Sequence, residues 1–211
     1  MTPKTLAEMV ENIANKNPAS VWGDTAAAVC MLAAALAGID GRGKIKTITF
    51  GDDATPDDSE APSISERLIN LADEDIEVEN AVRDALRIPA MIPSQRESRR
   101  TLLNEKYTAA VSAATRLLDV CGEAAEVIAA DDSRSDILTA QRAAALSLCI
   151  GAMQALKAEI LLRISRISDE AAAANLLKEN EQLCERYISS AESTRDDALC
   201  SLKNEQQQRL L

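Results

Sequence analysis

Residues 71 to 82 read Leu-Ala-Asp-Glu-Asp-Ile-Glu-Val-Glu-Asn-Ala-Val, and the stretch around them decides the fold class. Upstream, Ser63 and Glu66 have the spacing of a capping box, in which each residue satisfies a free backbone amide of the other. Downstream, Pro89 prevents the helix from continuing. The sequence therefore predicts a helix over residues 63–88, and the alanine-rich segments on both sides of it predict further helices.

The acidic residues of this predicted helix divide into two faces. Asp73, Glu77 and Asn80 share one face, and Asp75 and Glu79 share another. Like charges four residues apart repel, so a crowded carboxyl group can have a raised pKa and serve as a general acid or base. The alternative is an ordinary solvated face.

The rest of the chain repeats this helical pattern. Further helices are expected at residues 5–16, 25–37, 94–129, 136–167 and from 170 to a polar tail at 204–209. Gly122 is a candidate kink in the fourth of these six helices. Residues 39–62 are rich in Gly, Asp and Pro and predict an irregular loop, with a short β-like run at 46–50. Residues 1–211 are thus expected to form one all-α domain, an antiparallel bundle of about six helices.

Composition supports the bundle and excludes several functions. Hydrophobic residues make up 46% of the chain but aromatic residues only 2%, so small aliphatic side chains must build the core. The net charge of -11 argues against a nucleic-acid surface or an anionic membrane surface as partner. The apolar run at residues 25–39 is too short to span a bilayer, and residues 1–17 lack the pattern of a secretory signal.

The chain has no histidine, and this narrows the chemistry further. A Ser-His or Cys-His nucleophile system is excluded, and a zinc site is not expected. The five cysteines are scattered without CxxC spacing and are expected to be buried thiols in a reducing cytoplasm, at Cys30, Cys121, Cys149, Cys184 and Cys200. No Gly-rich phosphate loop and no EF-hand spacing is present.

The Asp73-Glu74-Asp75 segment, followed by Asn80 and Pro89, resembles the cyclodeaminase/cyclohydrolase family, which opens or deaminates one-carbon folates. The Ser135-Asp136 pair, at the start of a later helix, matches that family as well. In three places the sequence departs from it. Glu79 stands where the family has Phe, Val21-Trp22 replace two glycines of a Gly-rich turn at residues 17–24, and Glu159 and Arg163 replace a pair of asparagines four residues apart.

The resemblance implies a homodimer with ligand grooves at or near the subunit contact, and it implies a set of site residues. The catalytic candidates are Asp73, Asp75 and Asp136. The substrate-binding candidates are Asn80, Ser135, Pro18, Gly23, Trp22, Arg99 and Arg100. A tetrahydrofolate derivative is the expected substrate, with no metal, no tightly bound cofactor, no nucleic acid and no membrane as partner.

Each of these assignments has a structural alternative. Trp22 either stacks on a ligand or covers one end of the bundle. Ser135 and Asp136 are explained equally by capping a helix. Arg99 and Arg100 belong to a basic cluster with Arg96 and Lys106, which binds an acidic group such as a folate glutamate tail or pairs with nearby glutamates.

The function therefore has two main interpretations. The first is a divergent enzyme that acts on a cyclic amidinium or imine carbon. The second is a repurposed helical dimer that serves as a binding or scaffolding module, which the altered loop and Glu159-Arg163 favour. A generic helical binding protein of unrelated ancestry is a third possibility.

Overall fold

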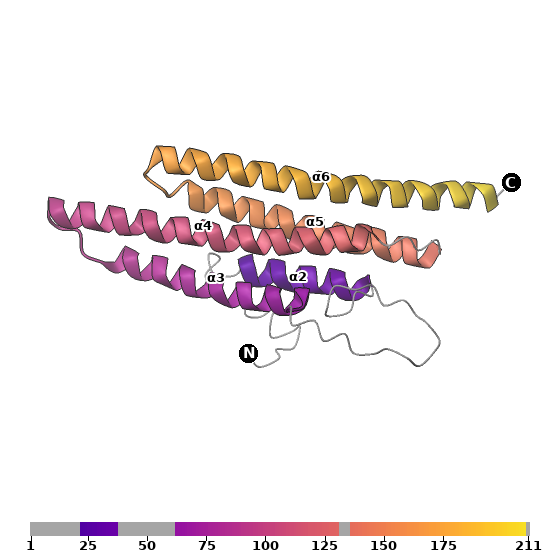
Figure 1. The fold of residues 1–211 in the computed structure, drawn as a ribbon, viewed down its shortest axis with the longest axis horizontal. Helices are drawn as coiled ribbons and strands as arrows, with labels where there is room; N and C mark the ends of the chain where they lie inside the picture. The colour runs from indigo at the N-terminus through magenta and orange to yellow at the C-terminus, as the bar shows by residue number, and fades with distance from the viewer. Residues whose placement is uncertain (1–21, 38–61, 131–135, 210–211) are drawn as a thin grey trace.

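The computed structural model describes residues 22–37, 62–130 and 136–209, and every element in these ranges is a helix. The helices are α2 (Trp22–Leu36), α3 (Ile64–Arg87), α4 (Pro93–Ala129), α5 (Asp136–Ile164) and α6 (Glu170–Arg209). They lie roughly alongside one another in an elongated bundle (Figure 1). The all-α prediction is confirmed. The helix expected at residues 5–16 and the irregular loop expected at 39–62, except its last residue, lie outside the described residues.

Two helices occupy the centre of the bundle. α4 packs against α3, α5 and α6, and α5 packs against α2, α4 and α6. Their facing sides form one hydrophobic cluster, built mainly from Ala, Leu and Ile as the composition predicts. Four buried thiols belong to this cluster, those of Cys30, Cys121, Cys149 and Cys184 from α2, α4, α5 and α6. The expectation of burial is wrong for Cys200, which is exposed near the end of α6.

Local signals set most of the helix ends. The Ser63 hydroxyl accepts a hydrogen bond from the Glu66 amide at 3.1 Å, and the Glu66 carboxylate accepts one from the Ser63 amide at 2.8 Å, so the predicted capping box is confirmed. Pro93 occupies the first turn of α4, where its missing amide hydrogen is not needed. The Asp169 carboxylate accepts from the amides of Ala171 and Ala172 and thereby caps α6.

The start of α2 differs from the prediction. The sequence predicts a turn at residues 20–24 and a helix from residue 25, but α2 begins at Trp22. Gly23 therefore lies within the first helical turn. With Trp in place of glycine at position 22, the chain carries a Cβ that is compatible with helix and disfavours the left-handed conformations of a Gly-rich turn.

Gly122 has a packing role in α4. The helix continues through it to Ala129, and a Cβ at this position would lie only 2.5 Å from two ring carbons of Tyr187 in α6. The Tyr187 hydroxyl donates to Asp119 of α4 at 2.6 Å, which holds the ring in place. The glycine thus allows α6 to approach α4 closely, and it needs no kink to explain it.

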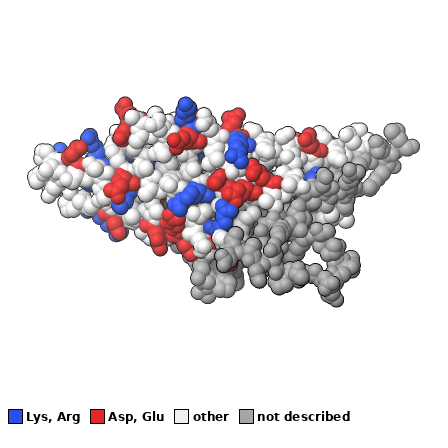
Figure 2. Space-filling view, viewed as in Figure 1, with Lys and Arg blue, Asp and Glu red and all other residues white. Residues whose placement is uncertain are grey.

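Charges of both signs are mixed on the face drawn in Figure 2. Lys and Arg side chains lie beside Asp and Glu there, and no broad basic area gathers on the described part of this face.

Candidate functional site: a buried ion cluster around Arg163

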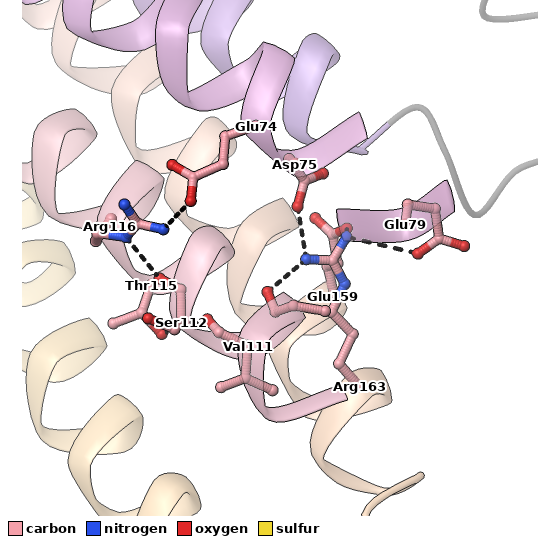
Figure 3. Close-up of polar contacts among 10 residues, drawn as sticks. Glu74, Asp75, Glu79, Val111, Ser112, Thr115, Arg116, Glu159 and Arg163 are labelled. Carbon is pink, nitrogen blue, oxygen red and sulfur yellow. Dashed lines mark hydrogen bonds and ion pairs between the residues drawn. The ribbon is translucent and has the colours of Figure 1, made fainter. Parts of the chain in front are cut away.

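Four charged side chains from α3 and α5 meet in the interior of the bundle. Arg163 Nη1 donates to Asp75 Oδ1 at 2.6 Å and to the backbone carbonyl of Ala110 in α4 at 2.7 Å. Its Nη2 lies 2.5 Å from a carboxylate oxygen of Glu159 and 3.9 Å from one of Glu79. Figure 3 shows these side chains converging on the guanidinium. One arginine thus links three helices.

The cluster is almost completely shielded from water. Asp75 and Glu159 are each 3% exposed and Arg163 is 5% exposed. Glu79 is the most accessible member, because 16% of its side chain is exposed. Any exchange of protons or ligands with solvent therefore has its shortest route along Glu79.

Burial controls the protonation of the two glutamates. Loss of hydration raises the pKa of Glu159 to about 8, against the opposing effect of Arg163 and with support from the charges of Asp75 and Glu79. Loss of hydration also raises the pKa of Glu79, although Arg163 and Arg83 oppose it. Burial alone would lower the pKa of Arg163, but the hydrogen bond that Arg163 donates to Asp75 and the charges of the surrounding carboxylates raise it.

The cluster contains more acid than base. Three carboxyl groups surround one guanidinium, so one cation cannot neutralise them all. Neither carboxylate oxygen of Glu159 has a hydrogen-bond donor, because the close Nη2 of Arg163 is not aligned with it as a hydrogen bond. Such a carboxyl group can hold a proton at neutral pH and release it to a ligand.

Helix α3 places the residues of the acidic segment on two different faces, as their spacing in the sequence implies. Asp75 and Glu79 point into the cluster, whereas Asp73, Glu77 and Asn80 are exposed on α3. The Asn80 side-chain oxygen accepts from Arg83 at 3.3 Å. The structure therefore brings Asp75 to the site but leaves Asp73 and Asn80 on the solvated face that was the alternative for this segment.

The basic candidates lie at the corner between α3 and α4. Arg99 donates to the backbone carbonyl of Leu86 at 2.7 Å, and Arg100 pairs with Glu97 at 2.9 Å. Eleven residues of helix separate Leu86 from Asp75, which corresponds to about 16 Å. Arg99 and Arg100 thus do not reach the cluster. Arg100 instead pairs with Glu97, and pairing with a nearby glutamate was the alternative interpretation of this basic region.

The remaining candidates are located only by their positions along the chain. Asp136 is the first residue of α5, and Trp22 and Gly23 are in the first turn of α2. Ser135 and Pro18 lie outside the described residues. Their roles in catalysis and substrate binding stay predictions.

From the sequence, Glu159 and Arg163 were identified only as a departure from the family's asparagine pair, and Glu79 was not among the predicted site residues. Their burial was missed, although a signal was available. Leu156, Ile160 and Ile167 mark the buried stripe of this part of the chain, and Arg163 follows Ile160 by three residues and Leu156 by seven. That spacing places Arg163 on the core side.

Within the described residues, no group of three or more Cys, Asp or Glu side chains is arranged to hold a metal ion. The cluster is instead organised around the guanidinium of Arg163. Its possible chemistry is therefore proton transfer and the binding of a cationic ligand group by carboxylates.

Comparisons with known proteins agree with the architecture. A family model described as Formiminotransferase-cyclodeaminase matches residues 5–182. The crystal structure of formiminotetrahydrofolate cyclodeaminase from Thermotoga maritima is similar, with a TM-score of 0.57 and 19% sequence identity, and the match covers 93% of this chain and 98% of that one. No curated protein matches the chain. The shared fold is shown at this level of identity.

Proposed function

The chain belongs to the formiminotransferase-cyclodeaminase family, and on that premise we propose that it is a divergent enzyme acting on a cyclic amidinium or imine carbon of a one-carbon tetrahydrofolate derivative. One observation carries the proposal. Asp75, an acid that matches the family's sequence pattern, lies in a buried cluster with Glu159, whose pKa is raised to about 8. A group that titrates close to neutral pH can both hold and give up a proton during a reaction.

The cluster supplies the groups that this chemistry needs without a histidine. An amidinium carbon is already electrophilic, so the protein has to place a water molecule, accept its proton and protonate the departing nitrogen. Glu79, the member nearest to solvent, is suited to accept the proton as the new C–O bond forms. Glu159, protonated at neutral pH, is suited to donate a proton as the C–N bond breaks. Asp75, fixed by Arg163, contributes negative charge beside the cation.

The departures from the family pattern support a changed substrate. Glu79, Glu159 and Arg163 are three such departures in sequence, and they contact one another in space. Two carboxyl groups and one guanidinium that differ from the family pattern therefore lie together in one place. We infer that the site handles charge differently from its relatives. We further propose that the enzyme acts in the cytoplasm, where its five free thiols remain reduced.

A second candidate function is favoured by a separate observation. Asp75 is bonded to Arg163 at 2.6 Å and is 3% exposed, so in this conformation it does not face a ligand. A member of the family whose acid has become part of the internal structure would serve as a binding or scaffolding module rather than as an enzyme.

The test is turnover of methenyltetrahydrofolate and formiminotetrahydrofolate by the purified protein and by Asp75→Asn. Asp84→Asn is the matched control, because Asp84 is on the same helix in an exposed pair with Arg87. We expect turnover by the wild type, a loss of about a hundredfold or more in kcat/KM for Asp75→Asn, and no change for Asp84→Asn. Absence of turnover in the wild type would reject the enzyme in favour of the binding module.

Two further tests address Asp136 and the Val21-Trp22 segment. Asp136→Asn should keep the fold, because Asn also caps a helix well, and should remove ring-opening activity. Undiminished turnover would remove Asp136 from the site. The Val21-Trp22 segment should weaken folate binding about tenfold to a hundredfold relative to a Gly-rich turn. Tight, stoichiometric binding of methenyltetrahydrofolate in calorimetric titration would contradict this.

A further inference from the structure

The connection between α3 and α4 differs in charge from the rest of the chain. We call residues 86–100 the α3–α4 corner, which comprises the end of α3, the connection and the first two turns of α4. The corner holds a single acid, Glu97, and four arginines, whereas the whole chain has 34 acidic residues against 23 basic ones. It is therefore a positively charged place on an acidic protein. The arginines are Arg87, Arg96, Arg99 and Arg100.

The same corner exposes large apolar side chains. Met91 is 81% exposed, which is the highest value for any large hydrophobic residue in the described part of the chain, and Ile92 is 53% exposed. Leu86 and Ile88 are exposed beside them. Figure 1 shows that the corner reaches beyond the turn between α5 and α6 at one end of the bundle. Apolar side chains gathered in such an accessible place mark a binding surface.

Side chains of the corner hold its backbone in one conformation. Gln95 Oε1 accepts a hydrogen bond from the amide of Met91 at 3.0 Å. Arg96 Nε donates to the carbonyl of Ala90 at 3.2 Å, and Arg99 donates to a carbonyl at the end of α3 at 2.7 Å. A surface that is already ordered loses little conformational freedom when a partner binds to it.

Two of the arginines are able to change partner. Arg87 pairs with Asp84 at 3.2 Å and Arg100 pairs with Glu97 at 2.9 Å, and all four side chains are more than 60% exposed. Exposed pairs of this kind contribute little to stability, so each guanidinium can exchange its own acid for one from outside at small cost. Arginine binds an incoming carboxylate through two parallel hydrogen bonds.

We propose that the α3–α4 corner is a docking surface for a different protein, whose binding segment presents carboxylates on both sides of one or two apolar side chains. Met91 and Ile92 contact the apolar side chains, and Arg87 and Arg100 bind the carboxylates. The inference does not depend on the proposed reaction, because the corner begins eleven residues of helix beyond Asp75.

Composition favours a protein segment over a membrane as the partner. Met and Arg are enriched and Lys is depleted in protein–protein interfaces, and the corner contains Met91 and four arginines but no lysine. Segments that rest on a membrane surface are commonly anchored by aromatic residues, and the corner has none. An anionic membrane is also an extended surface that would repel the acidic remainder of the chain, whereas a short acidic segment meets the corner alone.

The experiment is a fluorescence anisotropy titration of the full-length protein against a labelled peptide that has two leucines between two runs of glutamate. The test variants are Met91→Glu and Arg100→Gln. Ile137→Glu is the matched control for Met91→Glu, because Ile137 is 70% exposed and lies in the first turn of α5, at the other end of the bundle (Figure 1). We expect saturable binding by the wild type and Ile137→Glu, and affinity at least about tenfold lower in both test variants.

Three results would overturn the proposal by themselves. These are the absence of saturable binding by the wild type, an equal loss of affinity in Ile137→Glu, and equal affinity for a glutamate peptide without leucine, which would show general attraction of anions. Sedimentation of the wild type but not of Met91→Glu with phosphatidylserine vesicles would overturn it in favour of a membrane. A lower mass of Met91→Glu than of the wild type in light scattering would overturn it in favour of a second copy.

Discussion

The two sides of α5 reverse the usual distribution of charge on a helix. Its inner side carries Glu159 and Arg163 into the bundle at 3% and 5% exposed, whereas its outer side presents Ile137, Leu148 and Leu162 without a single charged neighbour among the exposed residues. A helix at the surface of a monomer normally places its apolar residues inside and its charges outside. The stability of a single bundle explains neither the buried charges of the inner side nor the exposed apolar residues of the outer side.

This difference between the two sides of α5 indicates which residues to test for function. A buried ion cluster is weak evidence for stability, because well-packed apolar residues often replace such clusters at no cost. Its presence on the inner side therefore points to chemistry or ligand binding. The apolar outer side points to a contact that the described part of the chain does not make. Five substitutions separate these explanations, and they are ordered by the size of the expected effect.

Arg163→Met should be the most damaging change. It leaves Asp75, Glu79 and Glu159 buried without their cation, which should lower the free energy of unfolding by about 3–5 kcal/mol. Arg100→Met is the control, because the Arg100–Glu97 pair is more than half exposed and should contribute less than about 0.5 kcal/mol. Denaturant unfolding measures both. Equal effects would mean that burial of the cluster has no energetic consequence.

The protonation of Glu159 should make stability depend on pH. Its pKa is about 8 in the folded chain and about 4.5 when unfolded, so between these values the folded state holds a proton that the unfolded state has lost. The contribution of this proton to the free energy of unfolding is therefore fully present below pH 4.5. It is lost as the pH rises to 8, by about 1.4 kcal/mol per pH unit.

Glu159→Gln removes this titrating group, so a comparison of the wild type with the variant measures the pH dependence that Glu159 causes. The stability of the wild type minus that of Glu159→Gln should fall steadily between pH 5 and pH 8. Thermal or denaturant unfolding at several pH values would show it. A difference that stays constant across this range would place the pKa of Glu159 outside it.

Two glycines sharpen the contrast between inside and outside. Gly122→Ala forces a Cβ to within 2.5 Å of the Tyr187 ring and should cost about 1–3 kcal/mol. Gly151→Ala meets no atom of its own bundle and should stabilise the monomer by about 0.5–1 kcal/mol. Denaturant unfolding measures both. Destabilisation by Gly151→Ala would show that the bundle itself requires this glycine.

The smallest effect is expected for the neighbour of Asp75. Glu74 pairs with Arg116 of α4, and the two side chains are 39% and 50% exposed. Arg116→Met should therefore change the free energy of unfolding by about 0–1 kcal/mol, although Glu74 and Asp75 are adjacent in sequence. A loss as large as that of Arg163→Met would contradict the distinction between the solvated and buried faces of α3.

The fold was predictable from sequence where its signals are local. The Ser63–Glu66 capping box and the end of the helix before Pro89 each depend on signals within a few residues, and both are confirmed. The predicted start of α2 was wrong by three residues, because the helix begins at Trp22 and not at residue 25.

The site was less predictable because its contacts are long-range. Asp75 and Arg163 are 88 residues apart in sequence, and only the packing of α3 on α4 and of α4 on α5 brings them together. Spacing correctly separated Asp75 and Glu79 from Asp73, Glu77 and Asn80. It could not show which of the two faces would be buried, since both carry acids.

The central claim is that the cluster around Arg163 is a proton-transfer site, and a pH–rate profile tests it most directly. The measurement is kcat/KM for methenyltetrahydrofolate between pH 6 and pH 9.5, for the wild type and Glu159→Gln. The wild-type rate should fall above a pKa near 8, as the Glu159 proton is lost. Glu159→Gln should be at least about a hundredfold slower and should lack this limb. An unchanged rate and profile in Glu159→Gln would contradict the claim.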